Sequence, residues 1–259
     1  MLIDTHCHLT YPGLEEQQAA VVQRAQQADV TRVITIGTHP EDHHGALVAS
    51  SRFAGVFAAL GIHPHHAAEV GDGFVQKLRQ LLQSSEKVVA VGECGLDYHG
   101  NSAPEAVQKK VFLDQVELAQ SLNLPLILHV RDAHQDTLNI MKHFTDMRFV
   151  VHCFSGTPQE CQHWIQLGAY VGFTGILTYK NALDVREACK LVPENRLLVE
   201  TDAPYLSPQP VRKIKINEPA FVTHVAAQVA VERGCDAAHV AAMTTQNAGE
   251  LFGAQLVHH

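Results

Sequence analysis

Eight short apolar runs recur along the chain, and they restrict its fold more than any other feature. Their Val, Ile and Leu residues are continuous instead of alternating with polar ones, and segments with helical spacing separate them. Such runs are typical of parallel strands that are covered by helices. The runs span residues 2–9, 30–40, 56–64, 88–97, 124–130, 148–153, 169–176 and 197–204.

Eight strand-and-helix units indicate that the sheet closes on itself. The length of 259 residues matches that of one eight-stranded β/α barrel. We therefore predict an α/β fold, with a single, distorted TIM-like (β/α)8 barrel domain over residues 1–259 and a metal site at the C-terminal strand ends. Helices are expected over residues 15–28, 41–53, 74–84, 105–122, 133–144, 158–167 and 182–191, and after the last strand over 218–233 and 237–252.

Five of the eight runs, the first, fourth, fifth, sixth and eighth, carry at or near their ends residues that can bind a metal. A barrel would bring these ends to one rim, so the fold and site predictions support each other. The candidate ligands are His6, His8, Glu93, His129, His152 and Asp202.

His6 and His8 lie two residues apart in an extended run, so both imidazoles face the same side. This spacing suits two bonds to one metal. Pairs of this kind also arise by chance, so the interpretation depends on further ligands. Asp4 lies on the same face and either orients the pair or has a structural role lower in the barrel.

The acidic candidates are predicted from the cost of burying charge. A carboxylate at the end of an apolar strand is expensive to bury unless it is paired or binds a metal. For Glu93 the alternative is an ion pair with Arg131. Asp202 follows Glu200 by two residues, so we expect one of the two to be a ligand and the other a deeper, paired residue. Asp202 is preferred because it is nearer the strand end.

Singly, His129 and His152 could also be hydrogen-bonded core histidines. However, the six candidates would then need six separate structural explanations, whereas a shared metal site needs one.

Charge and composition narrow the possible functions. A net charge of -8 argues against broad non-specific binding to nucleic acid, which requires many Lys and Arg. It does not exclude a phosphate substrate, because metal ions can neutralise a single phosphate locally. Eighteen histidines also permit a non-enzymatic metal-binding protein.

No apolar run is long enough for a membrane span, and the start of the chain has no basic segment followed by an apolar one. A cytoplasmic protein is therefore expected. Six cysteines without a C-x-x-C pair indicate reduced thiols. Cys7, Cys94 and Cys153 adjoin proposed ligands but should point away from the metal, because neighbouring strand residues face opposite sides.

An ordered set of motifs resembles the TatD family of metal-dependent deoxyribonucleases over nearly the whole chain. The motifs are DTHCH, GIHPH, GECGLDY, LPLILHVRDA, VVHCFSG and ETDAPYL followed by NEP. The resemblance implies a distorted barrel that holds one to three divalent ions. It implies that His6, His8, Glu93 and Asp202 hold one ion, and that Glu93, His129 and His152 hold a second, so that Glu93 bridges.

The resemblance also implies that His63 and Arg131 line a nucleic-acid site, where both could donate hydrogen bonds to phosphate. Among the tyrosines and other histidines of the rim loops, Tyr205 is the best further candidate for substrate binding. The segment VRKIKINEP, residues 211–219, departs from the usual Arg-Gly-Lys-Arg-Asn-Glu-Pro run of the family.

The function predicted is metal-dependent hydrolysis of DNA phosphodiesters, single-stranded or at ends, with two divalent ions of zinc, manganese or magnesium. Four imidazoles favour zinc, manganese or a similar transition ion in at least one position. Asp202 is the predicted proton acceptor. One alternative is an amidohydrolase-like esterase or deacylase. Many such enzymes bridge their metals with a carboxylated lysine at strand four or five, whereas this chain has Glu93 and His129 there.

Overall fold

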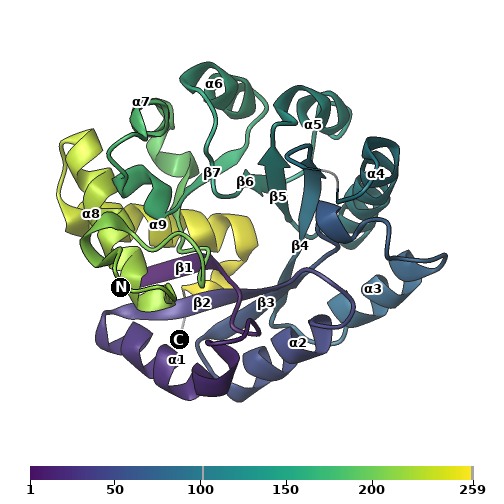
Figure 1. Cartoon of the computed structure of the whole chain (residues 1–259), viewed down its shortest axis with the longest axis horizontal. Coiled ribbons are helices and arrows are strands. Elements are labelled where there is room, and N and C mark those ends of the chain that lie inside the picture. The colour runs from purple at the N-terminus through teal and green to yellow at the C-terminus, as the bar shows by residue number, and fades with distance from the viewer. Residues whose placement is uncertain (101, 258–259) are drawn as a thin grey trace.

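Eight parallel strands form one sheet in chain order in the computed structural model, which describes residues 1–100 and 102–257 (Figure 1). Each strand pairs with the next. Between β8 and β1 the bonding is irregular, with one isolated bridge between Cys7 and Ala203. The barrel is therefore nearly closed, as predicted. The strands are β1 (Leu2–Cys7), β2 (Val30–Gly37), β3 (Val56–Leu60), β4 (Val88–Asp97), β5 (Leu126–Arg131), β6 (Phe149–Val151), β7 (Tyr170–Phe173) and β8 (Leu197–Val199).

Nine α-helices of the described residues lie where helices were predicted, and the helices from α1 to α8 surround the barrel (Figure 1). Most strands are shorter than the apolar runs that predicted them. As a result, His8, His152 and Asp202 lie just beyond the ends of their strands. The helices are α1 (Gln18–Gln27), α2 (His43–Arg52), α3 (Phe74–Leu82), α4 (Glu105–Leu122), α5 (His134–Met141), α6 (Pro158–Gln166), α7 (Leu183–Leu191), α8 (Val222–Arg233) and α9 (Ala237–Phe252).

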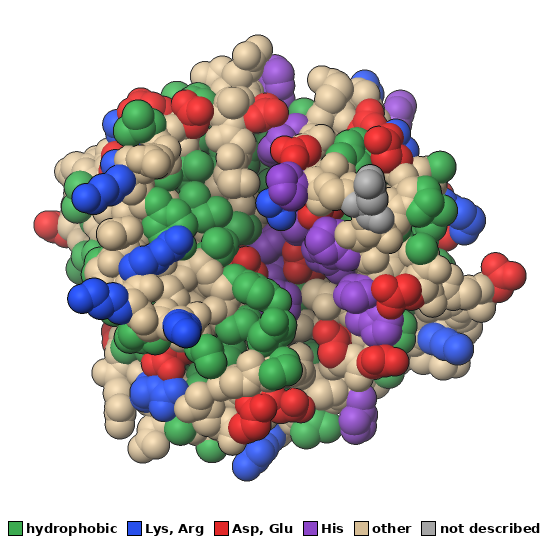
Figure 2. Space-filling view, in the orientation of Figure 1, with side chains coloured by type: hydrophobic (Ala, Val, Ile, Leu, Met, Phe, Trp, Pro, Cys, Tyr) green, Lys and Arg blue, Asp and Glu red, His purple; other side chains and the backbone are tan. Residues whose placement is uncertain are grey.

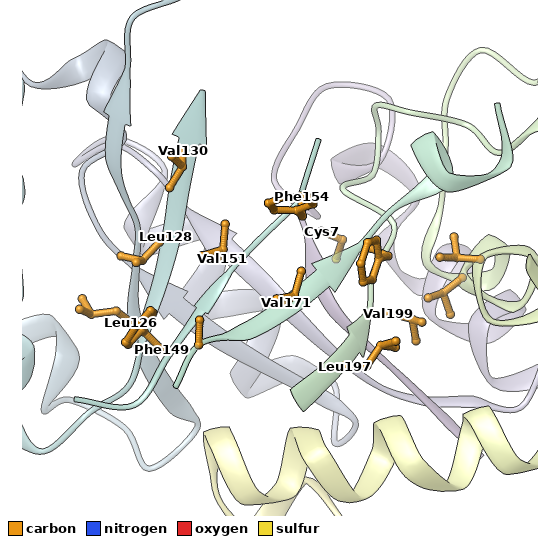
Figure 3. Packing of buried hydrophobic residues seen from close by; sticks show 14 of the residues in the cluster. Cys7, Leu126, Leu128, Val130, Phe149, Val151, Phe154, Val171, Leu197 and Val199 are labelled. Atoms are coloured by element: carbon orange, nitrogen blue, oxygen red, sulfur yellow. The ribbon is translucent and has the colours of Figure 1, made fainter. Parts of the chain in front are cut away.

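Apolar side chains fill two layers. Those on the outer face of the sheet pack against the surrounding helices, and Figure 3 shows Leu126, Leu128 and Val151 among them. Burying one such side chain fully stabilises the fold by roughly 1.5–3 kcal/mol. Cys7 and Cys94 belong to this outer layer, so they point away from the barrel interior, as predicted.

The inner layer lies low in the barrel, where α9 covers the end opposite the C-terminal strand ends. Leu251 and Phe252 of α9 cluster with inward-facing residues such as Ile36. The Asn247 amide donates hydrogen bonds to the carbonyls of Leu197 (2.8 Å) and Glu194 (2.6 Å), which ties α9 to the strand end. The face of the barrel at the C-terminal ends of the strands therefore stays open.

A bulge in β4 directs Glu93 into the barrel. Val91 pairs with Leu126 but Cys94 pairs with Leu128, so β4 has one residue more than β5 between these two points. Gly92 has a φ of 142°, and a Cβ there would lie 2.6 Å from the Ile127 carbonyl oxygen, so only glycine fits. Bulges often re-aim a side chain next to an active site.

No helix among the described residues has the length and apolar character that crossing a bilayer requires.

Candidate metal centre

A cleft of about 890 Å³ opens at the C-terminal ends of the strands. Its lining includes all the predicted site residues except His6, which lies fully buried beneath it. Figure 2 shows histidine and acidic side chains gathered around the hollow near the centre of this face. The structure therefore brings the predicted residues to one rim.

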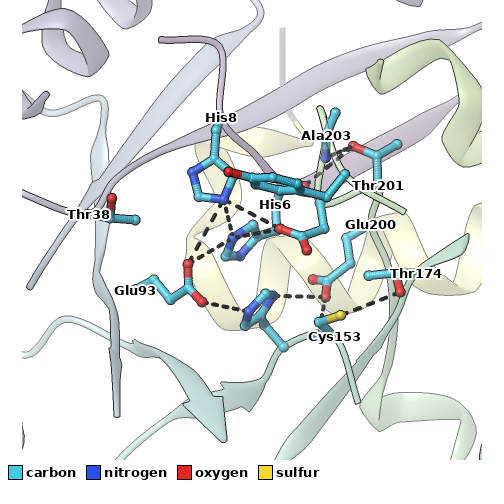
Figure 4. Close-up of polar contacts among 12 residues, drawn as sticks. His6, His8, Thr38, Glu93, Cys153, Thr174, Glu200, Thr201 and Ala203 are labelled. Carbon is cyan, nitrogen blue, oxygen red and sulfur yellow. Dashed lines mark hydrogen bonds and ion pairs between the residues drawn. The ribbon is translucent and has the colours of Figure 1, made fainter. Parts of the chain in front are cut away.

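Four donor atoms converge on one side of the cluster, and one of them is Oε2 of Glu93. The Nε2 atoms of His6 and His8 are 3.3 Å apart. Glu93 Oε2 lies 3.4 Å from His6 Nε2 and 4.0 Å from His8 Nε2. Asp202 Oδ1 lies 3.7 Å and 3.4 Å from the same two nitrogens. Figure 4 shows Glu93 directed at His6 and His8. Donors around a tetrahedral zinc are about 3.4 Å apart, so these separations suit one ion.

The other oxygen of Glu93 faces a second group. Oε1 lies 2.7 Å from His129 Nδ1 and 2.8 Å from His152 Nε2. His63 Nε2 lies 3.6 Å from the same oxygen. The two oxygens of one carboxylate thus serve two sets of imidazoles.

Two further acids hold the imidazoles of this second group from behind. Asp97 Oδ2 accepts a hydrogen bond from His129 Nε2 at 2.8 Å. Glu200 Oε1 lies 3.4 Å from His152 Nδ1. A carboxylate on one ring nitrogen fixes the ring and makes the other nitrogen a better ligand. Glu200 is buried and also accepts a hydrogen bond from Thr5 Oγ1, so it is the deeper, paired acid that was expected.

Asp97 was not among the predicted site residues, although the sequence contained a signal for it. After the bulge, β4 pairs regularly with β5, so Glu93 and Asp97, four residues apart, face the same side. Gly95 lies between them, and a Cβ there would lie 2.0 Å from the His129 carbonyl oxygen.

Asp4 has the structural role that was one of its two alternatives. It is buried and accepts hydrogen bonds from Thr201 N (2.8 Å) and Thr201 Oγ1 (2.6 Å). Because Thr201 follows β8, Asp4 joins β1 to β8 where the regular ladder is missing.

Opposite charges stabilise each other across the cluster. Burial raises the pKa of Glu93, but the His152 charge and the hydrogen bonds from His129 and His152 outweigh it and hold this pKa well below its usual value. Burial lowers the pKa of His152, but the Glu93 charge and the Glu200 contact outweigh it and raise this pKa well above its usual value. The cluster therefore favours ionised carboxylates and added positive charge.

The donor set fits a metal. His6, His8 and Glu93 offer donor atoms that lie within 4.8 Å of one another, and so do His63, Glu93 and His129. The His6 ring stacks on that of His152 with centroids 3.8 Å apart. Two close-packed imidazoles whose Nε2 atoms face carboxylate oxygens are arranged as ligands of cations. No cysteine belongs to the candidate ligand groups of the described residues.

His63 is held as a hydrogen-bond donor. Its Nδ1 accepts the backbone N–H of His65 at 3.1 Å, so in the neutral ring the proton is on Nε2, which faces the cleft. Burial first, and then the His129 charge, lower the pKa of His63 well below its usual value. A neutral donor is thus presented beside Glu93.

Arg131 and Tyr205 are exposed members of the cleft lining. Among the described residues no ion pair joins Arg131 to Glu93, so that alternative for Glu93 is wrong. The Tyr205 ring lies edge-on to the His8 ring, with centroids 6.2 Å apart.

A β/α barrel with paired carboxylates and imidazoles at its C-terminal rim defines the class of metal-dependent hydrolases. The chain belongs to the TatD related DNase family, whose model matches residues 3–253. Both the predicted family and the predicted enzyme class, a metal-dependent hydrolase of the nuclease type, are confirmed.

Individual relatives agree with this assignment. The chain is 37% identical to the uncharacterized metal-dependent hydrolase YabD of Bacillus subtilis (strain 168), covering 97% of this chain and 99% of that one. It is 37% identical to the 3'-5' ssDNA/RNA exonuclease TatD of Cronobacter sakazakii, covering 97% of each. The crystal structure of YJJV, a TatD homolog from Escherichia coli K12, superposes with a TM-score of 0.92 at 34% identity, covering 97% of each chain.

Proposed function

We propose that the chain hydrolyses phosphodiester bonds of DNA, in single strands or at ends, with two divalent ions held at the rim. The observation that carries the proposal is the division of Glu93, whose Oε2 faces His6 and His8 and whose Oε1 faces His129 and His152. The relative from Cronobacter sakazakii named an ssDNA/RNA exonuclease supports a nucleic-acid substrate.

His6, His8, Glu93 and Asp202 would hold one ion, and Glu93, His129 and His152 the second, with Glu93 bridging as a catalytic residue. When bound, the ions would supply Lewis acidity that lowers the pKa of water and offsets negative charge on the attacked phosphate. The many imidazoles favour zinc or manganese over magnesium in at least one position.

Asp202 is the proposed proton acceptor. Both of its contacts with the imidazoles involve Oδ1, which leaves Oδ2 to accept the proton of the attacking water. Burial raises its pKa, but the His8 hydrogen bond and nearby imidazole charges outweigh this and lower it. The carboxylate is therefore ionised and ready to accept a proton.

Three residues of the cleft would bind substrate. The Nε2–H of His63 would donate to a phosphate oxygen, and Arg131, exposed at the rim, would pair with a phosphate charge. Tyr205, beside His8, would contact the nucleotide.

The test is digestion of single-stranded, duplex and 3'-recessed oligonucleotides by chelator-treated protein before and after addition of zinc, manganese or magnesium. We expect activity only after metal is restored, and faster cleavage of the single-stranded and recessed substrates. Asp202→Asn, prepared in parallel, should be inactive and controls for contaminating nucleases. Full activity of protein shown by elemental analysis to be metal-free would refute the proposal.

The same preparation separates the alternatives. Hydrolysis of a p-nitrophenyl carboxylic ester, without cleavage of any oligonucleotide, would indicate an esterase. Metal binding that survives replacement of the rim ligands would indicate dispersed binding by other histidines. We also propose the cytoplasm as the compartment. The six thiols, which are all free, support it, and cell fractionation would test it.

A further inference from the structure

The cleft has two walls of different chemistry. One carries the histidines and carboxylates described above. The opposite wall is largely apolar and includes Tyr11, Pro12, Ile176, Tyr205 and Leu206. Figure 2 shows hydrophobic side chains on one side of the hollow facing histidines and acids on the other. Binding of a phosphate explains only the first wall.

The exposed aromatic residues of the described chain are concentrated on this apolar wall. Tyr11 and Tyr205 are 41% and 47% exposed, and every other Phe, Tyr and Trp of the described residues is at least partly buried. Their ring centroids are 5.3 Å apart and the ring planes meet at 69°. The two exposed aromatics thus form one surface beside the metal centre.

Backbone hydrogen bonds fix both tyrosines relative to candidate ligands. Tyr11 N donates to His8 O at 3.1 Å, and Tyr205 N donates to Asp202 O at 2.9 Å. Each tyrosine therefore follows a candidate ligand by three residues and is tied to it by a turn. The Asn217 amide also donates to Tyr205 O at 2.6 Å. The backbone beneath this surface therefore needs little ordering when a partner binds.

Positive charge lies close to this wall. A Cβ on Gly13 would lie 2.7 Å from Ile216 Cδ1, so the loop that carries Tyr11 contacts the loop of residues 211–216. Lys213 and Lys215 are exposed on that second loop. Apolar rings beside cations, facing a phosphate-binding wall, match a nucleotide with its base on one side and its phosphates on the other.

We propose that Tyr11 and Tyr205 form a stacking platform that holds one unpaired nucleobase next to the scissile phosphate. This rests on the proposed nuclease function and deepens it by naming what the substrate must present. Every base has a π-face, so the platform accepts any sequence. A base inside a duplex is already stacked, so the platform favours single strands and frayed ends.

The test compares Tyr11→Ala, Tyr11→Leu and Tyr11→Phe, and the same series at Tyr205, on matched single-stranded oligonucleotides. One substrate is complete, and the others lack a single base, replaced by tetrahydrofuran, at each of the last three positions in turn. Val231→Ala, which changes an exposed side chain of α8, is the control variant.

On the complete substrate we expect each Ala variant to raise KM by about 5- to 150-fold, the range for loss of one stacked base, with a much smaller effect on kcat. Phe should preserve KM, and Leu should not. At one position, removing the base should bring wild type and the Ala variant to nearly the same KM. If the ratio of the two KM values is the same with and without the base at every position, the platform does not exist.

Binding of a short strand containing 2-aminopurine distinguishes failure of this inference from failure of the proposed function, because it requires no cleavage. Phosphorothioate linkages keep the strand intact with the metal-loaded protein. Stacking should quench the fluorescence with wild type and with Tyr11→Phe but not with Tyr11→Ala. Equal quenching by wild type and the Ala variants at each labelled position would overturn the inference even if every oligonucleotide is cleaved.

Discussion

Glu93 is the residue on which the proposed two-ion arrangement depends, because its two oxygens face two separate groups of imidazoles. His152 contacts only one of these oxygens, Oε1. Loss of Glu93 should therefore weaken both ion sites and leave the two ions repelling each other. Loss of His152 should weaken only one ion site.

We expect Glu93→Ala to retain clearly less metal than His152→Ala, which should keep about one ion per chain at the His6, His8 and Asp202 group. The measurement is tightly bound metal per chain by elemental analysis. A cooperative thermal transition for each variant must first show that it is folded. Equal metal contents in the two folded variants would mean that Glu93 is not the bridge.

Asp97 should tune metal affinity without touching the ions. It accepts the Nε2–H of His129, and its pKa is about 2, because the His129 hydrogen bond and charge outweigh the effect of burial. Asp97→Asn should weaken binding of the second ion by about 10- to 100-fold. Competition with a chelating dye measures the affinity for the second ion, and Asp114→Asn on the surface of α4 is the control. Unchanged affinity would assign Asp97 a purely structural role.

At this scale the sequence predicted the six candidate ligands because metal-binding residue types stood at strand ends. The sequence favoured Asp202 over Glu200 as the ligand because Asp202 is nearer the strand end. It did not identify Asp97, since the role of that carboxylate depends on His129, a neighbour from another strand. Tyr11 was missed for a related reason, because only the closed barrel brings it against Tyr205.

Among the elements, β4 has a local shape that the sequence did not reveal. The apolar run predicted its bounds correctly, yet the bulge at Gly92 appears only in the pairing with β5. The helices were predicted well because their polar faces and caps are local signals. An example is α6, where Thr157 and Glu160 form a capping box.

Gly92→Ala should destabilise the protein more than Gly168→Ala. Both positions have positive φ, but a Cβ at Gly168 meets nothing within 4 Å, whereas at Gly92 it meets the Ile127 carbonyl oxygen at 2.6 Å. A residue other than glycine at either φ costs on the order of 1–3 kcal/mol, and the clash at Gly92 adds about 1–3 kcal/mol. Urea unfolding of the metal-free proteins measures the difference. Equal unfolding free energies would mean that the bulge relaxes to accept a methyl group.

Helices α5 and α6 are joined by a hydrogen bond that should fail in acid. Trp164 Nε1 donates to His134 Nδ1 at 2.9 Å, so this nitrogen must stay unprotonated. Burial lowers the pKa of His134 below its usual value of 6.5, so the unfolded chain takes up this proton at a higher pH than the native protein. Stability from this group is therefore complete above pH 6.5 and falls as the pH drops towards the native pKa.

The comparison is His134→Gln, whose amide oxygen can still accept from Trp164 but does not titrate. Between pH 7.5 and 5.5 the unfolding midpoint of wild type should fall further than that of the variant. Trp164 is the single tryptophan of the chain, so its fluorescence follows both the contact and unfolding. Parallel pH dependence of the two proteins would show that His134 is already protonated, or not linked to folding.

For the molecule as a whole, closure of the barrel explains why residues nearly 200 positions apart form one site. The sequence predicted this closure from the number of strands and the chain length. It could not predict the irregular β8–β1 seam, because the hydrogen bonds of Asp4 and Thr201 have no local signal. A single domain over residues 1–259 stays a prediction, as does the oligonucleotide specificity.

The charge of the whole molecule predicts a shallow salt dependence of binding to short single strands. The net charge is -8, and Arg131 is the single Lys or Arg among the described residues that line the cleft. Arg212 is stacked on Tyr179, with its guanidinium carbon 3.9 Å from the ring centroid, so Lys213 and Lys215 are the freer cations nearby.

Each phosphate neutralised by a side chain contributes roughly -0.7 to the slope of log K against log salt on a single strand. Arg131, Arg212, Lys213 and Lys215 together would give a slope of about -3. Fluorescence anisotropy of a labelled, uncleavable strand measures this slope across a range of potassium chloride concentrations at a fixed metal concentration. Lys213→Ala with Lys215→Ala should make the slope shallower by about 1.4. A wild-type slope steeper than about -5 would mean that the strand follows a basic surface outside the cleft, and not the short path between the tyrosine wall and the histidine wall.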